Sequence, residues 1–367
     1  MKPALGLRGT KLNIGHICTV ILPAYICFGY LMAVTSGIET RQSWVHTFPQ
    51  MDTVNTTGPK EAENSRIKGT VTAIFNLGCL FSALSCIVVG DILGRRRTFM
   101  LGLVITIVGS ILQSSAFSLP QLTIGRFVAG FGFGGVTATG PNWQSETVQP
   151  RLRGFIVMLQ SIFLCTGLAL AGWLEYGLAF AEGSVTWRLP LAVPCFLCLL
   201  FLCWAPVWPD SPRWLIKKGR IDDARNVLAM LRDESVGSPG IGSFKNIFRD
   251  GPARFANRAF IAVSLQMGQQ ICGANALTFY QSTIFETYLG MDGTLSLLMS
   301  AVLFTWKMLI APIGTLTIDK AGRRKLLLIA FGGMDICMAV MAGCISQPSN
   351  TTAVHTAVAS IFLYVFF

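Results

Sequence analysis

The chain has 367 residues and a formal net charge of +11, and 52% of its residues are apolar whereas only 13% are charged. Soluble domains carry about 25% charged residues, and a mean hydropathy of +0.56 is too high for a solvated surface. A soluble enzyme, a disordered tail and a secreted mini-protein are therefore excluded, and the composition predicts a polytopic membrane protein.

The positive charge does not indicate a nucleic-acid partner. Basic patches bind phosphate backbones, but most Lys and Arg residues here lie in short segments between long apolar stretches. That arrangement is typical of the positive-inside rule. All 11 cysteines lie inside apolar stretches, where cysteine behaves as a small hydrophobic residue. We therefore expect free thiols, no metal site, no cofactor and no nucleic-acid partner.

Apolar runs of about 20 residues predict membrane-spanning helices. Nine complete runs occur in chain order, and a tenth begins near residue 353 and meets the chain end; the nine lie at 14–36, 70–90, 98–117, 121–141, 155–178, 189–207, 258–283, 295–318 and 326–345. The sequence thus predicts an all-α polytopic protein in a lipid bilayer.

The polar stretch 208–257 divides the spans into two groups. We expect an N-terminal bundle of six spans (1–207), a linker (208–257) and an incomplete C-terminal bundle of four spans (258–367). Within the linker, apolar residues recur at helical spacing, which predicts a short amphipathic helix with an apolar face made of Ile221, Ala224, Val227, Leu228 and Leu231.

The charge distribution predicts a cytosolic N-terminus, because this orientation places most Lys and Arg residues in cytosolic loops. The N-glycosylation sequences at Asn55 and Asn350 then lie outside, where glycosylation takes place. We expect a multi-pass glycoprotein of the plasma membrane.

Two short loops carry the same phrase. Asp91-Ile-Leu-Gly-Arg-Arg96 joins spans 2 and 3, and Asp319-Lys-Ala-Gly-Arg-Arg324 joins spans 8 and 9. The glycine permits a tight reversal, and the aspartate can cap a helix or pair with arginine. Two copies at matching places in the two halves favour a functional element over a loop that merely anchors topology.

With these loops, further motifs make the chain resemble the sugar porter family of the major facilitator superfamily, particularly its fungal members. They are Gly125-Arg126, Gln144-Ser-Glu146, Arg153-Gly154, Pro209-Asp-Ser-Pro-Arg-Trp-Leu215 and Gln269-Gln-Ile-Cys-Gly-Ala-Asn275. The resemblance implies a fold of two six-helix bundles, the second truncated here, with a midplane site and alternating access. It also implies a cytosolic gate of ion pairs across the bundles, formed by Asp91, Arg95, Glu146, Arg153, Asp319 and Arg323.

Buried amides are costly in a membrane and tend to face the interior. With the resemblance, Gln269, Gln270 and Asn275 are expected to contact the hydroxyl groups of a solute, although they could instead join helices. Three glycines of span 4 at 130, 132 and 134 are expected to allow close helix packing rather than to bind phosphate.

The departures from the family pattern concern the substrate path. Leu31 stands where proton-coupled relatives carry aspartate, so Arg126 is expected to lack its usual partner and the usual proton route to be absent. Ser161 replaces a sugar-binding glutamine. Lys307 stands where many relatives have a sugar-contacting asparagine. We predict that Lys307 pairs with Asp335 inside the membrane, unless Lys307 instead lines a watery cavity.

These residues leave three hypotheses open. The first is a carrier of a sugar, polyol or similar small polar solute. The second is an exporter of a biosynthetic metabolite on the same fold, with Ser161 and Lys307 reshaping the cavity for an anionic or bulky cargo. The third is an inactive truncated carrier or a sensor. An enzyme is not expected, because paired carboxylates, a catalytic triad and a metal cluster are missing from the water-accessible segments.

Overall fold

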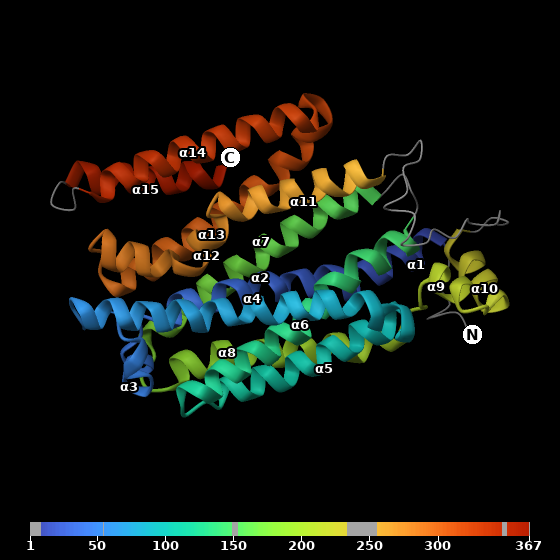
Figure 1. Ribbon diagram of the computed structural model, residues 1–367, viewed down its shortest axis with the longest axis horizontal. Helices are drawn as coiled ribbons and strands as arrows, with labels where there is room; N and C mark the ends of the chain where they lie inside the picture. Colours follow the sequence, from blue (N-terminus) through green and yellow to red (C-terminus); the bar gives the residue numbers. More distant parts are fainter. Residues whose placement is uncertain (1–8, 54, 149–152, 233–254, 347–350, 367) are drawn as a thin grey trace.

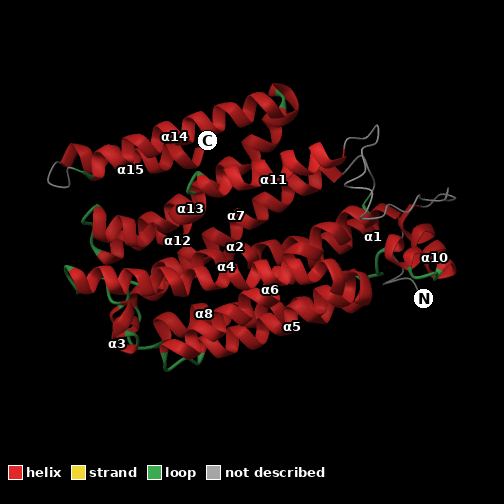
Figure 2. Cartoon of the chain, in the orientation of Figure 1, coloured by secondary structure: helices red, strands yellow, loops and turns green. Residues whose placement is uncertain are grey.

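The structure is a computed structural model that describes residues 9–53, 55–148, 153–232, 255–346 and 351–366. These residues form helices and short connections, and no strand occurs among them (Figure 2). Figure 1 shows long helices packed side by side, with the second half of the chain lying along the first. The predicted all-α architecture is confirmed.

Helical segments occupy all ten predicted span positions. In chain order they are α1 (Gly9–His16) with η2 (Ile17–Ile21) and α2 (Leu22–Ile38), α4 (Pro59–Leu93), α5 (Arg95–Ser114), α6 (Leu119–Thr147), α7 (Arg153–Gly177), α8 (Val185–Trp204), α11 (Phe255–Ile271) with α12 (Ala274–Thr283), α13 (Gly293–Ala321), α14 (Arg323–Ile345) and α15 (Thr351–Phe366). Shorter elements connect them, namely α3 (Gln42–Thr47), η3 (Pro49–Met51), η4 (Leu178–Phe180), η5 (Ala205–Val207), α9 (Pro212–Lys217), α10 (Ile221–Arg232) and η7 (Ile284–Tyr288).

Seven of the described helices are long and apolar enough to cross a membrane, judged by length and composition alone. α6 is not among them, because its many glycines and Arg126 lower its hydropathy. The segment α11–α12 is not among them either, because it breaks at Gly273, whose φ of +82° lies in the left-handed region that glycine tolerates. The sequence predicts this segment as one continuous helix, and the structure differs.

The glycines of α6 allow close packing, as predicted. A Cβ atom on Gly130 would lie 2.1 Å from the Phe75 carbonyl oxygen of α4, and one on Gly132 would lie 2.4 Å from the Thr106 nitrogen of α5. The backbones of α4, α5 and α6 are therefore in direct contact, which larger residues would prevent.

Two helices of the first half, α2 and α7, contact the second half. α2 and α7 cross through Gly29 and Gly167, each of which lies against the other helix's backbone. α7 in turn packs on α13, where Gly172 lies against Ala301 and Phe304. The longest contact between the halves therefore runs through α7, which lies between them in Figure 1.

The linker begins with two helices that pack at one end of the first half. In α10 the residues Ala224, Val227, Leu228 and Leu231 are buried, whereas Ile221 is 58% exposed. The buried face joins a core that includes Leu12 of α1. This end, where α4 meets α5, is called the Arg95 end below; the opposite end, where α2 finishes and α4 starts, is called the Lys68 end.

The start of a helix differs from the prediction where the helix extends beyond its apolar run into polar sequence. α4 begins at Pro59 rather than near residue 70, because the polar stretch before the apolar run is also helical. The glycine of each repeated loop does adopt a positive φ, +90° at Gly94 and +81° at Gly322, which is the reversal that the motif predicts.

Candidate functional site

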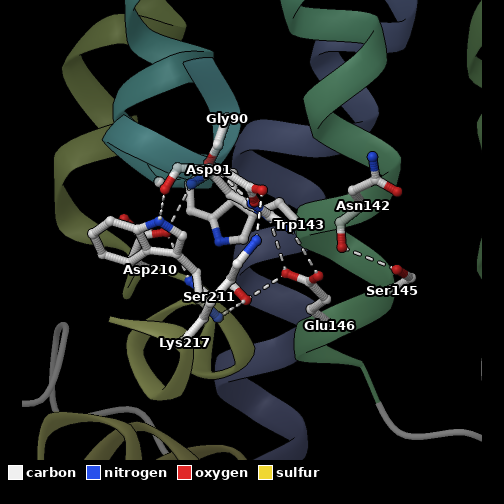
Figure 3. A network of polar contacts seen from close by, with 12 residues as sticks. Gly90, Asp91, Asn142, Trp143, Ser145, Glu146, Asp210, Ser211 and Lys217 are labelled. Atoms are coloured by element: carbon white, nitrogen blue, oxygen red, sulfur yellow. Dashed lines mark hydrogen bonds and ion pairs between the residues drawn. The ribbon is translucent and has the colours of Figure 1, made fainter. Parts of the chain in front are cut away.

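A polar network lies at the turn between α4 and α5, where Figure 3 shows Asp91, Glu146 and Ser211 close together. The Nη1 of Arg95 lies 3.4 Å from Asp91 Oδ1 and 2.9 Å from the Gly90 carbonyl oxygen, and its Nε lies 3.3 Å from Glu146 Oε2. Lys217 of α9 approaches from the linker, with its Nζ 2.5 Å from Asp91 Oδ2. Because one guanidinium holds two carboxylates, it ties the end of α6 to this turn.

The linker completes the network. Asp210 Oδ1 accepts the backbone N–H groups of Arg95 at 3.1 Å and Arg96 at 3.3 Å, at a helix N-terminus where negative charge is favourable. Ser211 caps α9 and donates its hydroxyl hydrogen to Glu146. The Pro-Asp-Ser-Pro-Arg-Trp-Leu segment is therefore folded onto the repeated loop.

Three of the residues predicted for the gate, Asp91, Arg95 and Glu146, lie together in this network. The contacts that the structure describes join the first half to the linker, whereas the prediction places ion pairs across the two bundles. The side chains of the other three predicted members lie outside the described residues: Arg153, Asp319 and Arg323. Sequence reasoning missed Asp210, Ser211 and Lys217 as partners of this network.

A cavity of about 210 Å³ lies within the second half, between α11, α12, α13, α14 and α15. Most of its lining is apolar, which is usual for a small-molecule site with a few placed polar groups. The polar lining residues are Gln269, Thr278, Gln281, Lys307 and Tyr364.

Three of these residues use their donor groups on the protein itself. Thr278, Gln281 and Tyr364 each donate to a backbone carbonyl oxygen at 2.9 to 3.0 Å. The oxygen of each side chain keeps lone pairs for a further hydrogen bond. Toward a ligand the hydroxyls of Thr278 and Tyr364 are therefore hydrogen-bond acceptors, whereas Gln281 keeps its oxygen and one N–H hydrogen. Such acceptors suit the hydroxyl hydrogens of a polyhydroxylated solute.

The predicted substrate residues lie in three places. Gln269 and Lys307 line the cavity. Gln270 and Asn275 lie at the break between α11 and α12, where the asparagine amide donates to the glutamine oxygen. Ser161 is exposed on α7 and is not among the cavity-lining residues.

A second charged cluster lies at the Lys68 end and was missed by sequence reasoning. Lys68 Nζ lies 3.4 Å from Glu39 Oε2 and donates to Thr283 Oγ1 at 3.0 Å. The Thr72 hydroxyl donates to Glu39 Oε1 at 3.1 Å. Glu39 and Lys68 are both 3% exposed. Burial raises the pKa of the Glu39 carboxyl above its usual range, and the charges of Lys68 and Arg126 oppose this shift.

Over the residues that the structure describes, Arg126 contacts a hydroxyl group and an aromatic ring rather than a carboxylate. Its Nη2 lies 3.4 Å from Thr35 Oγ1, and its guanidinium carbon lies 5.4 Å from the centre of the Phe75 ring. A hydroxyl group and an aromatic ring thus contact Arg126, and the loss of its usual carboxylate partner at position 31 stays a prediction. Leu31 is buried, at 1% exposed, and Thr35 follows it by one helical turn on the same face of α2.

Hydroxyl groups also join the two halves at this end. Ser36 of α2 donates to the Ser282 hydroxyl of α12 at 3.2 Å, and Ser282 lies 3.1 Å from the Ser300 hydroxyl of α13. The Ser36 oxygen accepts the Ser282 backbone N–H at 3.1 Å. The Lys68 end is thus closed by direct polar contacts between the halves.

Comparison with known proteins identifies the family to which the chain belongs. The profile of the family described as "Sugar (and other) transporter" matches residues 17–367. The chain belongs to this family of the major facilitator superfamily. Its members are membrane-embedded multi-pass transporters, not enzymes. The structure also resembles the E. coli xylose transporter XylE in a partially occluded inward-open conformation, with a TM-score of 0.75 and 20% identity over 96% of this chain and 81% of that one.

Fungal transporters are among its relatives. The MFS-type transporter oryC of Aspergillus oryzae is 31% identical over 93% of this chain and 65% of its own length. The sugar transporter STL1 of Saccharomyces cerevisiae is 29% identical over 99% of this chain and 67% of its own length. The chain thus spans about two thirds of the length of these relatives.

Lys307 and Asp335, which are predicted to pair, lie in different environments. Lys307 lines the cavity, whereas Asp335 is exposed on α14. Among the described residues, no ion pair joins them. The prediction of a Lys307–Asp335 pair is therefore wrong, and the alternative, in which Lys307 lines a cavity, describes its position. The two side chains lie on different helices, α13 and α14, whose facing sides the sequence does not specify.

Proposed function

We propose that the chain is a membrane carrier that moves a sugar, a polyol or a similar small polar solute by alternating access. The observation that carries this proposal is the cavity in a sugar transporter family member, with acceptor groups on Thr278, Gln281 and Tyr364 and the amide of Gln269. Such groups match the hydroxyls of a solute, and Thr278, Gln281 and Tyr364 cost little when the solute is absent, because each of these three already has a partner.

Alternating access requires contacts that form and break at both ends. The Ser36–Ser282 and Lys68–Thr283 contacts support a closed state at the Lys68 end. The Arg95 network supports a gate at the other end, to which Arg153, Asp319 and Arg323 would contribute in the state where the bundles meet. The positive-inside rule makes the Arg95 end cytosolic, with Asn55 on the outer face as a glycosylation site of a plasma-membrane protein.

Coupling to protons by the usual route is not part of this proposal, because Leu31 cannot titrate. The test is uptake of a labelled hexose and polyol panel in sugar-carrier-deficient yeast, with and without a protonophore, after surface location is verified. We expect saturable uptake whose rate is unchanged by the protonophore. Uptake abolished by the protonophore would contradict facilitated transport, and no uptake from a surface-located protein would contradict a sugar or polyol carrier.

A second candidate is export of a biosynthetic metabolite on the same fold. The observation that favours it is Lys307, because an ammonium group in the cavity is not needed for a neutral sugar. Efflux of a preloaded solute from the same yeast cells distinguishes export from uptake.

A further inference from the structure

The ammonium group of Lys307 is exceptional within the cavity. The residues that line it include amides, hydroxyls and apolar side chains, and Lys307 is the charged member of the set. No aspartate or glutamate is found among these lining residues. The cavity of the described chain therefore presents one positive charge without a compensating negative charge on its walls.

The ion pairs within the described part of the chain do not include Lys307. An unpaired ammonium group at membrane depth is costly, and buried charges in membrane proteins normally pair or face a watery path. Other buried cations of this chain do find partners, as Lys68 does with Glu39. A negatively charged ligand would supply the missing partner to Lys307.

The other polar groups restrict the rest of the ligand. Thr278 and Tyr364 offer acceptors because their hydroxyl hydrogens are already engaged, and Gln281 offers its amide oxygen beside one remaining N–H hydrogen. Acceptor groups favour ligand groups that donate. Hydroxyl groups donate, whereas a carboxylate only accepts. The walls therefore suit a molecule with several hydroxyls and one carboxylate, with the carboxylate at Lys307.

We propose that the carrier selects a hydroxylated monocarboxylate, such as a sugar acid, over the corresponding neutral sugar, and that Lys307 is the specificity-determining residue. This inference rests on the proposed transport function and names its substrate class. A neutral sugar in the same cavity would leave the ammonium without a counter-charge, which is an energetic penalty that the acid does not incur.

The experiment uses the full chain in yeast and two probes that differ only at C6, D-galacturonate and D-galactose. At pH 6 the galacturonate carboxyl is ionised. We expect the ratio Vmax/KM for uptake to be at least about tenfold higher for galacturonate than for galactose. This is the size of effect expected for one charged hydrogen bond. Lys307→Met should lower galacturonate uptake more than galactose uptake and so remove this preference, and Lys307→Arg should retain it.

Lys60→Met is the matched control, because Lys60 is exposed in the first turn of α4 and the change also removes one ammonium. It should leave the preference intact. A wild-type carrier that transports galactose but neither transports galacturonate nor is inhibited by it would overturn the inference and leave the proposed function standing. So would an equal loss of both activities in Lys307→Met.

A binding measurement keeps the two proposals separable. Purified wild-type protein should be thermally stabilised by galacturonate, gluconate or quinate more than by galactose, because ligand binding to the folded state raises its stability. Stabilisation by an acid with no transport of any solute would contradict the proposed function alone. Stabilisation by none of the three acids would contradict the carboxylate specificity, whichever way uptake turns out.

Discussion

Lys68 joins the two halves of the molecule, since its ammonium nitrogen lies 3.4 Å from Glu39 in the first half and 3.0 Å from Thr283 in the second. An ammonium has three hydrogens to donate, so it can hold a carboxylate of its own half and a hydroxyl of the other half together. The ion pair therefore positions the group that closes the Lys68 end.

Lys68→Met should destabilise the protein by about 3–5 kcal/mol, because it leaves the buried Glu39 carboxylate without its closest counter-charge. The double change Glu39→Gln with Lys68→Met should recover most of this loss. Thermal unfolding of the purified variants measures both. Equal stability of the single and the double variant would show that Glu39 and Lys68 are not coupled.

Glu286 makes stability depend on pH. Burial raises the pKa of its carboxyl above 4.5, while a hydrogen bond from Thr40 and the charges of Lys68 and Arg41 oppose the shift. With a raised pKa in the folded state, the stabilisation is complete below 4.5 and is lost as the pH rises through the folded-state pKa. Wild-type Tm, compared with that of Glu286→Gln, should therefore fall as the pH rises from 4 to 7, and a constant difference would contradict this.

Arg95→Lys should reduce uptake about tenfold with surface location unchanged. Lysine lacks the guanidinium fork whose Nη1 and Nε contact Asp91 and Glu146, and one lost charged hydrogen bond is worth about 1.5–3 kcal/mol. The kinetics of uptake measure the effect. Lys218→Met, which removes a charge from an exposed neighbouring position, is the control and should be silent.

Gly130→Ala should cost about 1–3 kcal/mol, since its Cβ atom would lie 2.1 Å from the Phe75 carbonyl oxygen. Gly177→Ala is the matched control, because Gly177 is also helical but a Cβ atom added to it would meet nothing within 4 Å. Its stability should be unchanged or slightly higher. Comparable losses in the two variants would exclude the packing explanation.

Hydropathy and motif spacing are sufficient to predict the helices, because each span is a local apolar run. The close packing of Gly130 and Gly132 follows from sequence as well, since small residues in an apolar helix have few other uses. The Lys68–Glu39 pair does not follow. The two residues are far apart in the chain, and both lie near span ends, where charged residues are ordinarily solvated.

The candidate site shows the same division. The motifs that carry the family resemblance predict that Asp91, Arg95 and Glu146 belong to one gate, and the structure brings these three together although Glu146 lies 51 residues from Arg95 in the chain. The fate of Gln270 and Asn275 depends on the helix break at Gly273, which turns them toward each other instead of the cavity. Spacing along an unbroken helix cannot represent that rotation.

The break at Gly273 also divides the cavity wall between two helices, the second of which bends again at Tyr280. Gln269 belongs to α11, whereas Thr278, Gln281 and the Ser282 contact with the first half belong to α12. α12 has ten residues, which corresponds to about 15 Å of helix. A pivot of roughly 10° at its glycine would sweep the far tip through roughly 2.6 Å, enough to part a hydrogen bond. Opening of the Lys68 end and reshaping of the solute chamber would then be one mechanical event.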